Sequence, residues 1–186
     1  MRTDGTLIDP FCGSGTILIE GAMLAMHIAP GLRRHFAAEK WKAVPGNIWD
    51  NEHIAAKALE RRDEGFLAFG YDIDPEAVRL TLENAKKAGV AQYISAEVRD
   101  IKDFSNDGPF GCVICNPPYG ERLLDVKTAE DIYKTMGHVF TPKRGWSYAA
   151  ISPDERFETC FGKKADRRRK LYNGMIRCQY YMYFKA

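Results

Sequence analysis

Short apolar runs alternate with longer amphipathic segments along most of the chain. The runs predict strands at residues 7–8, 66–69, 93–98, 112–115 and 147–152, and two further strand-like stretches flank Asn173-Gly174. The amphipathic segments predict helices between them, at residues 17–26, 50–62, 76–87 and 128–140. Several strands are apolar without interruption, which is typical of a parallel sheet with helices on both faces. This pattern predicts an α/β, Rossmann-like fold.

The last two strands differ from the others because an Asn-Gly step separates them. Asn173-Gly174 between strand-like runs is a strong hairpin signal. We therefore expect a mostly parallel seven-stranded sheet that ends in an antiparallel hairpin. Whether the first strands are truncated upstream of Leu7 stays open.

Residues 30–62 interrupt the regular alternation. They contain two Pro-Gly steps, a pair of arginines and two tryptophans, Trp41 and Trp49. We expect an insertion, within a single domain of residues 1–186, that folds over the sheet edge. The alternative is a surface excursion whose tryptophans pack on the body of the protein.

Composition adds few constraints. The 186 residues are 45% hydrophobic and 28% charged, which is ordinary for a globular protein, and the net charge of +2 is too small to imply a nucleic-acid partner by itself. No apolar run approaches the roughly 18 residues of a membrane span, and the N-terminus does not resemble a signal peptide. We expect a cytoplasmic protein with no membrane association.

The cysteine and histidine pattern does not predict a metal site. The five cysteines are odd in number and mostly lie in apolar strands, which suits reduced, buried thiols. Cys112 and Cys115 have the spacing of a zinc or redox pair, but no second pair exists and both lie in a predicted buried strand. The four histidines show no ligand spacing. We expect no metal.

A glycine-containing loop follows the first predicted strand. It runs from Asp9 to Thr16 and includes Phe11, Gly13, Ser14 and Gly15. Doubly wound folds bind ligands at such a strand-to-helix crossing. The third glycine of the dinucleotide pattern is absent, which favours a smaller ligand over a pyrophosphate. Asp9 suits an ammonium group or a sulfonium-bearing amino acid, whereas glycines that serve only a tight turn are the alternative.

Further acidic residues follow the next two strands. Asp72 ends the second strand, where its carboxylate can accept hydrogen bonds from both hydroxyls of a ribose. Asp74, followed by Pro75, is equally well explained as a helix cap. Asp100, after the third strand, is a candidate acceptor for the exocyclic amine of adenine, with a plain turn aspartate as the alternative.

The fourth strand ends in a rigid turn, Asn116-Pro117-Pro118-Tyr119. The Asn116 carboxamide oxygen and the carbonyl that follows it can accept the two hydrogens of a planar amine, each bond contributing about 0.5–1.5 kcal/mol. The prolines fix this geometry in advance, and Tyr119 can stack on a base that has left its helix. We expect these four residues to hold an amine for catalysis. A proline-rich turn that only caps the strand is the alternative.

The C-terminal region holds six cations within eight residues, from Lys163 to Lys170. Such a cluster either contacts phosphate groups or keeps an edge strand solvated so that it does not pair with another sheet. Together with Arg33 and Arg34 it favours RNA as the partner.

The order of polar residues at successive strand ends resembles that of the class I S-adenosylmethionine-dependent methyltransferases that act on amino nitrogens. These residues are Asp9, Asp72, Asp100 and the turn Asn116-Pro117-Pro118-Tyr119. Three stretches resemble more closely a family of RNA methylases, namely residues 9–16, 29–41 and 116–123. This resemblance covers nearly the whole chain. The best-known bacterial members of that family methylate N2 of a guanine in 23S ribosomal RNA.

The resemblance implies that residues 1–186 form a catalytic domain that uses S-adenosylmethionine and releases S-adenosylhomocysteine. It assigns the methionine part of the cofactor to residues Asp9, Phe11, Gly13, Ser14, Gly15 and Thr16. It assigns the ribose to Asp72 and the adenine to Ile73, Asp100 and Ile101. Residues Asn116, Pro117, Pro118 and Tyr119 would hold the guanine amine, and Asn116 is expected to contact the cofactor as well.

Members of that family usually carry an RNA-binding THUMP domain and a further helix upstream of the first motif, whereas only six residues precede Leu7 here. We therefore expect this chain to lack the THUMP domain, and to be a fragment or to need a partner chain that docks RNA. The Asn-Pro-Pro-Tyr turn alone does not separate guanine in RNA from adenine N6 in DNA or glutamine N5 in a protein. A non-catalytic fragment that binds cofactor or RNA is a further alternative.

Overall fold

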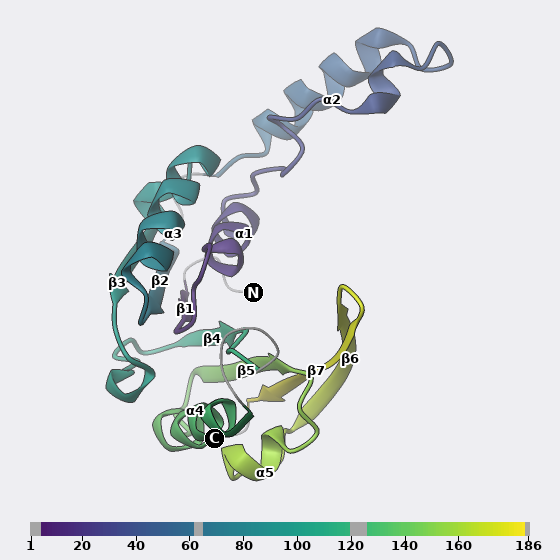
Figure 1. The fold of residues 1–186 in the computed structure, drawn as a ribbon. Coiled ribbons are helices and arrows are strands. Elements are labelled where there is room, and N and C mark those ends of the chain that lie inside the picture. Colours follow the sequence, from purple (N-terminus) through teal and green to yellow (C-terminus); the bar gives the residue numbers. More distant parts are fainter. Residues whose placement is uncertain (1–4, 62–64, 120–125, 185–186) are drawn as a thin grey trace.

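The computed structural model describes residues 5–61, 65–119 and 126–184, and its centre is a seven-stranded sheet of order β3-β2-β1-β4-β5-β7-β6 (Figure 1). The strands are β1 Thr6–Asp9, β2 Leu67–Asp72, β3 Ile94–Val98, β4 Gly111–Cys115, β5 Trp146–Ser152, β6 Arg167–Asn173 and β7 Ile176–Tyr183. Strands β1 to β5 pair in parallel, and β7 pairs antiparallel with both β5 and β6. The predicted Rossmann-like fold is confirmed.

Helices cover both faces of the sheet. They are α1 Thr16–Ala25 and α3 Pro75–Ala88 on one face and α4 Val126–Val139 and α5 Phe157–Phe161 on the other. A further helix, α2 Gly46–Ala58, lies in the insertion, and short 3-10 turns are η1 Ala37–Lys40, η2 Ala91–Tyr93 and η3 Ile101–Asp103. Alternate residues of β4 divide the core, because Cys112 and Ile114 pack with α1 whereas Val113 and Cys115 pack with α4. No helix in the described ranges is long and apolar enough to cross a membrane.

Helix α3 forms where its sequence signals place it. Asp74 caps its N-terminus by accepting a hydrogen bond from Glu76 N at 2.9 Å, and Pro75 follows at the first helical position. Gly89 ends the helix with φ of 73°, a left-handed conformation that glycine adopts without a Cβ penalty. The capping interpretation of Asp74 is thus confirmed.

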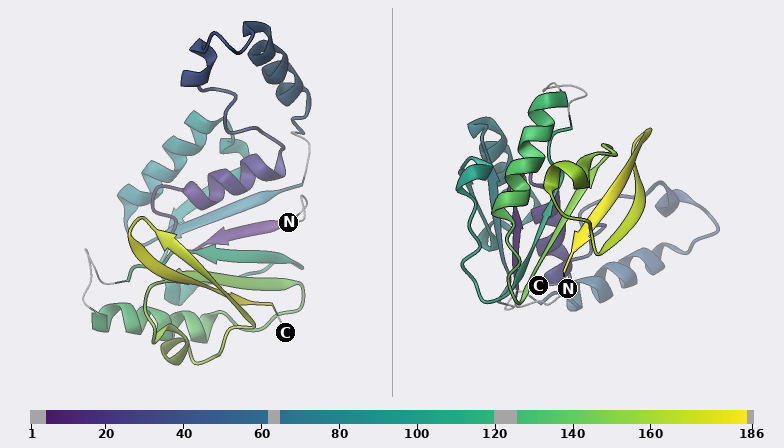
Figure 2. Two further views of the ribbon diagram at one scale, coloured as in Figure 1. Left: turned by 90° about the vertical axis from the view of Figure 1, so that its right-hand side faces the viewer. Right: turned by 90° about the horizontal axis from the view of Figure 1, so that it is seen from below.

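The insertion is placed differently from both expectations. Its helix α2 begins at Gly46, directly after Pro45, rather than at residue 50, and it projects beyond α1 and α3 away from the sheet (Figures 1 and 2). Trp41 is 63% exposed, and Trp49 stacks on Phe36 of the same insertion with ring centroids 5.6 Å apart. The predictions of a fold over the sheet edge and of tryptophans packed on the body are therefore wrong. Within the insertion, Trp49 packs on Phe36, whereas Trp41 faces solvent.

The C-terminal hairpin is confirmed, with its turn shifted by one residue. Asn173 pairs with Ile176, so Asn173 is the last residue of β6 and the turn consists of Gly174 and Met175. Gly174 has φ of 60°, as a tight turn of this kind requires. The short helix α5 was not predicted because its five residues are too few to show a period.

Candidate functional site

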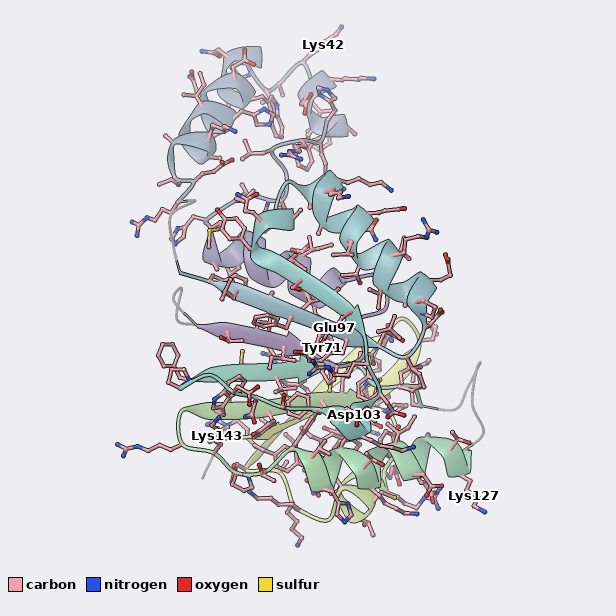
Figure 3. The ribbon with its side chains drawn as sticks, turned by 90° about the vertical axis from the view of Figure 1, so that its left-hand side faces the viewer. Lys42, Tyr71, Glu97, Asp103, Lys127 and Lys143 are labelled. Carbon is pink, nitrogen blue, oxygen red and sulfur yellow. The ribbon has the colours of Figure 1, made fainter. Side chains whose placement is uncertain are left out.

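The predicted site residues come together because parallel strands end at one edge of the sheet. Asp100, Asp72, Asp9 and Asn116 follow β3, β2, β1 and β4, and these strands lie side by side in that order. The connection after β1 runs to β2, whereas β4 lies on the other side of β1. Open α/β sheets bind ligands at such a switch point. Figure 3 marks this region by Tyr71 and Glu97, which are paired across β2 and β3, and shows Lys42 of the insertion far from them.

The loop between β1 and α1 is held in shape by helix α3. Gly15 has φ of +81°, and a Cβ on it would lie 2.9 Å from the Thr81 side chain. The Thr81 hydroxyl donates to Gly13 O at 3.0 Å, and Asn84 Nδ2 donates to Ser14 O at 2.9 Å. The Ser14 and Thr16 hydroxyls are 2.9 Å apart. Gly15 thus serves close packing against α3 as well as the turn.

Sequence reasoning missed Thr81 and Asn84 as supports of this loop. Thr81 is fully buried on α3, on the face that also buries Val78 and Ala85. The available signal was the spacing of two polar residues three positions apart beside that buried face. Gly13 differs from Gly15, since a Cβ there would meet only Phe11 O at 4.0 Å. The backbone at Gly13 is therefore open to a ligand.

Asp72 connects the loop to the end of β2. One carboxylate oxygen accepts from Gly13 N at 3.0 Å, and the other accepts from Asp74 N at 3.1 Å. A carboxylate offers about four lone-pair positions, so two acceptor sites remain for hydroxyl donors. Ile73, the next residue, is 72% exposed and offers an apolar surface beside that carboxylate.

Asp9 is a buried carboxyl group at the switch point. It is 2% exposed and accepts a hydrogen bond from Phe11 N at 3.1 Å. Burial raises the pKa of Asp9 from 3.8 to about 7, the Phe11 N–H opposes this rise, and the negative charge of Asp72 adds to it. A cation bound beside Asp9 would compensate for this burial, because it stabilises the ionised form.

Asp100 and Ile101 form the start of the turn after β3. Asp100 caps η3 by accepting from Lys102 N at 2.9 Å, and Lys102 Nζ lies 3.7 Å from its other oxygen. The turn role is therefore confirmed, while adenine recognition by Asp100 stays a prediction. Ile101 is 9% exposed and packs in the core beside the site.

The Asn116–Tyr119 turn follows directly from β4. Asn116 is exposed, Pro117 is buried, and Pro118 and Tyr119 are half-buried. The Tyr119 hydroxyl accepts a hydrogen bond of 2.8 Å from Nδ2 of Asn173, at the tip of the β6–β7 hairpin. Asn173 was predicted only as a turn residue. The remainder of this stretch, residues 120–123, lies outside the described residues.

The cysteines form no disulfide, and Cys12, Cys115 and Cys178 are buried. Burial raises the pKa of the Cys115 thiol, and the charge of Asp9 adds to this effect. Across the described ranges, no three His, Cys, Asp or Glu side chains are grouped to hold a metal ion. The thiols are packed as apolar side chains.

Known proteins resemble this chain over nearly its whole length. The model of the RMKL-like methyltransferase domain family matches residues 1–182. YpsC of Bacillus subtilis is 40% identical over 181 residues, which cover 97% of this chain and 47% of YpsC. The protein of Methylococcus capsulatus named ribosomal RNA large subunit methyltransferase K/L is 37% identical over 185 residues, 96% of this chain and 25% of that protein.

A solved structure agrees with the fold in detail. The crystal structure of SMU.472 complexed with SAH matches with a TM-score of 0.94 and 37% identity, and the match covers 100% of this chain and 49% of that chain. The chain therefore spans about half the length of YpsC and SMU.472 and about a quarter of the K/L protein.

Proposed function

The chain belongs to the RMKL-like methyltransferase domain family, and on that premise we propose that it transfers a methyl group from S-adenosylmethionine to an amino nitrogen of RNA, N2 of a guanine in 23S ribosomal RNA. One observation carries the proposal. The Asn116–Tyr119 turn ends β4 directly beside β1, whose last residue is the buried Asp9. A cation site and an amine-holding turn at adjacent strand ends suit methyl transfer from a sulfonium to an amine.

The residues at this edge fit the cofactor. Asp9 would hold the positively charged end, since it is a buried carboxyl group without a cationic partner among the described residues. Asp72 would hold the ribose with its remaining acceptor positions, and Gly13 leaves room for close approach of the ligand. Ile73 and Ile101 would flank the adenine. When bound, S-adenosylmethionine supplies a methyl group on a positively charged sulfur.

The Asn116–Tyr119 turn would prepare the amine. An exocyclic amine is a weak nucleophile because its lone pair is delocalised into the ring. Acceptance of its two hydrogens by the Asn116 side chain and the following carbonyl draws the lone pair out of conjugation. The proton leaves after the new bond has formed, so no side chain with a matched pKa is needed. Tyr119 would stack on the base and hold its plane.

The test is methylation of a defined substrate. The protein is incubated with labelled S-adenosylmethionine and undermodified ribosomal RNA, and the modified nucleoside is identified by mass. We expect N2-methylguanosine, and Asn116→Ala lowers the rate by more than about tenfold, or about 1.4 kcal/mol of barrier. Far-UV circular dichroism and thermal unfolding show that the variant is folded, because Asn116 is itself expected to contact the cofactor. Labelled adenine in DNA, labelled glutamine in protein, or no binding of millimolar cofactor would each contradict the proposal.

A further inference from the structure

The β6–β7 hairpin reaches the same edge of the sheet as the Asn116–Tyr119 turn. Ser152, the last residue of β5, pairs with Gln179, whereas β7 begins earlier, at Ile176. The hairpin therefore continues past the end of β5, and its tip stands clear of the helices where the parallel strands end (Figures 1 and 2). Strand β6 is the last strand of the sheet, so one of its edges faces solvent.

The tip of this hairpin contacts the proposed catalytic turn. Asn173 Nδ2 donates a 2.8 Å hydrogen bond to the Tyr119 hydroxyl, across a separation of 54 residues. The rigid Pro117-Pro118 segment fixes the backbone of Tyr119, and Asn173 fixes the far end of its side chain. A tyrosine held at both ends loses less freedom when a base stacks on it. The Tyr119 hydroxyl also keeps its own hydrogen for donation, because it acts as the acceptor toward Asn173.

The strand that leads to this tip carries unpaired positive charge. Arg167 and Arg169 are exposed and point to the same side of β6 as Asn173, because side chains on one side of a strand recur every second residue, about 6.6 Å apart. No salt bridge joins either arginine to a residue within the described ranges. Arg169 lies opposite the half-buried Tyr180 of β7. Cations beside an aromatic ring are the usual surface for a single nucleic-acid strand.

Arg168, between them, has a different role. Its side chain points to the other side of β6, where Arg168 Nε donates to Glu158 Oε1 at 2.8 Å and its guanidinium lies 5.8 Å from the Tyr181 ring centre. Its charge is therefore compensated by Glu158 within the protein. Three consecutive arginines thus separate into two that are free to bind phosphate and one that ties β6 to α5.

We propose that β6 is an RNA-docking strand on which Arg167 and Arg169 bind the phosphates of a single-stranded segment, while Asn173 positions Tyr119 against the target base. This inference rests on the proposed function, because it requires RNA as the methyl acceptor. Arg167 and Arg169 are binding residues, and Asn173 is a positioning residue that acts through Tyr119.

The docking role is tested by paired variants of the whole chain. Arg167→Gln combined with Arg169→Gln is expected to raise the KM for RNA about tenfold or more, and to make the slope of log affinity against log salt shallower by about 1.4. Arg168→Gln is the matched control, with a KM within about threefold of the parent. Calorimetry with S-adenosylmethionine verifies that each variant is folded. Equal effects of the double variant and the control would overturn the docking role.

The positioning role is tested by a double-mutant cycle. Asn173→Ala and Tyr119→Phe, which keeps the ring, are each expected to lower kcat about fivefold, with the KM for RNA and the affinity for S-adenosylmethionine within about twofold of the parent. The double variant is expected to be no slower than the slower single variant. Multiplied effects would refute the coupling. If the parent methylates no RNA at all, the proposed function fails instead, which distinguishes the two results.

Discussion

Replacing Asp9 by asparagine tests whether the site carries a buried charge at the expense of stability. The two side chains have nearly the same shape, and the amide oxygen of the variant can still accept from Phe11 N, as the Asp9 carboxylate does at 3.1 Å. Burial raises the pKa of Asp9 from 3.8 to about 7. Between these values the folded protein binds more protons than the unfolded chain, so its stability falls as the pH rises.

The size of the effect follows from the same two values. Ionisation of Asp9 lowers the free energy of unfolding by about 2–3 kcal/mol between pH 5 and pH 8. Each tenfold change in proton concentration corresponds to about 1.4 kcal/mol. The amide of the Asp9→Asn variant cannot ionise, so the variant shows no such loss. Without cofactor, Asp9→Asn is therefore expected to gain about 2–3 kcal/mol of unfolding free energy relative to the parent as the pH rises over this range.

The assay is urea unfolding of both proteins at pH 5, 6, 7 and 8 without cofactor. Comparing the two proteins at each pH removes any constant effect of the substitution. Asp74→Asn is the matched control, because it removes one negative charge from an exposed helix cap, where asparagine serves equally well. A stability difference between parent and Asp9→Asn that stays constant from pH 5 to pH 8 would refute the reasoning. Calorimetry should also show weaker binding of S-adenosylmethionine to Asp9→Asn.

Two further substitutions test the support of the glycine loop. Gly15→Ala places a Cβ 2.9 Å from the Thr81 side chain at φ of +81°, so thermal unfolding should show a loss of about 1–3 kcal/mol, whereas Gly46→Ala, where a Cβ meets nothing within 4 Å, should be neutral or stabilising. A loss at both positions would contradict the packing argument. Thr81→Val keeps the side-chain shape but leaves Gly13 O without its donor, and should cost about 1–3 kcal/mol in urea unfolding and weaken cofactor binding. Unchanged affinity for S-adenosylmethionine would show that the loop does not need this support.

The strands and the edge of the site could be predicted because their signals are local. Most of the predicted parallel strands are short apolar runs followed by a polar residue, and parallel pairing then brings Asp9, Asp72 and Asn116 to one edge. Asp74 and Gly89 mark the ends of α3, because aspartate is a preferred residue at the start of a helix and glycine at its end.

The missed features depend on contacts between distant residues. Thr81 and Asn84 support the glycine loop from positions 68 and 70 residues away, so their spacing on α3 marks two neighbouring polar residues but does not identify the loop that they contact. Asn173 gives the signal of a turn, and its contact with Tyr119 exists only once the hairpin has folded against the sheet. The position of the insertion was predicted wrongly for another reason. Its helix α2 buries no residue, so the sequence carries no apolar spacing that could indicate what the helix packs against.

The hydrogen bond from Gly13 N to Asp72 has a consequence for how a ligand of two parts binds. It joins residues 59 positions apart, and these belong to the proposed seats of the methionine and adenosine halves of the cofactor. Binding of either half of the cofactor orders both Gly13 and Asp72, because the hydrogen bond joins them. The second half then binds to a site that is already ordered and loses less conformational entropy. Adenosine bound alone should therefore tighten the subsequent binding of methionine. The reaction product, S-adenosylhomocysteine, keeps both halves, so it should dissociate slowly and compete with S-adenosylmethionine for the site.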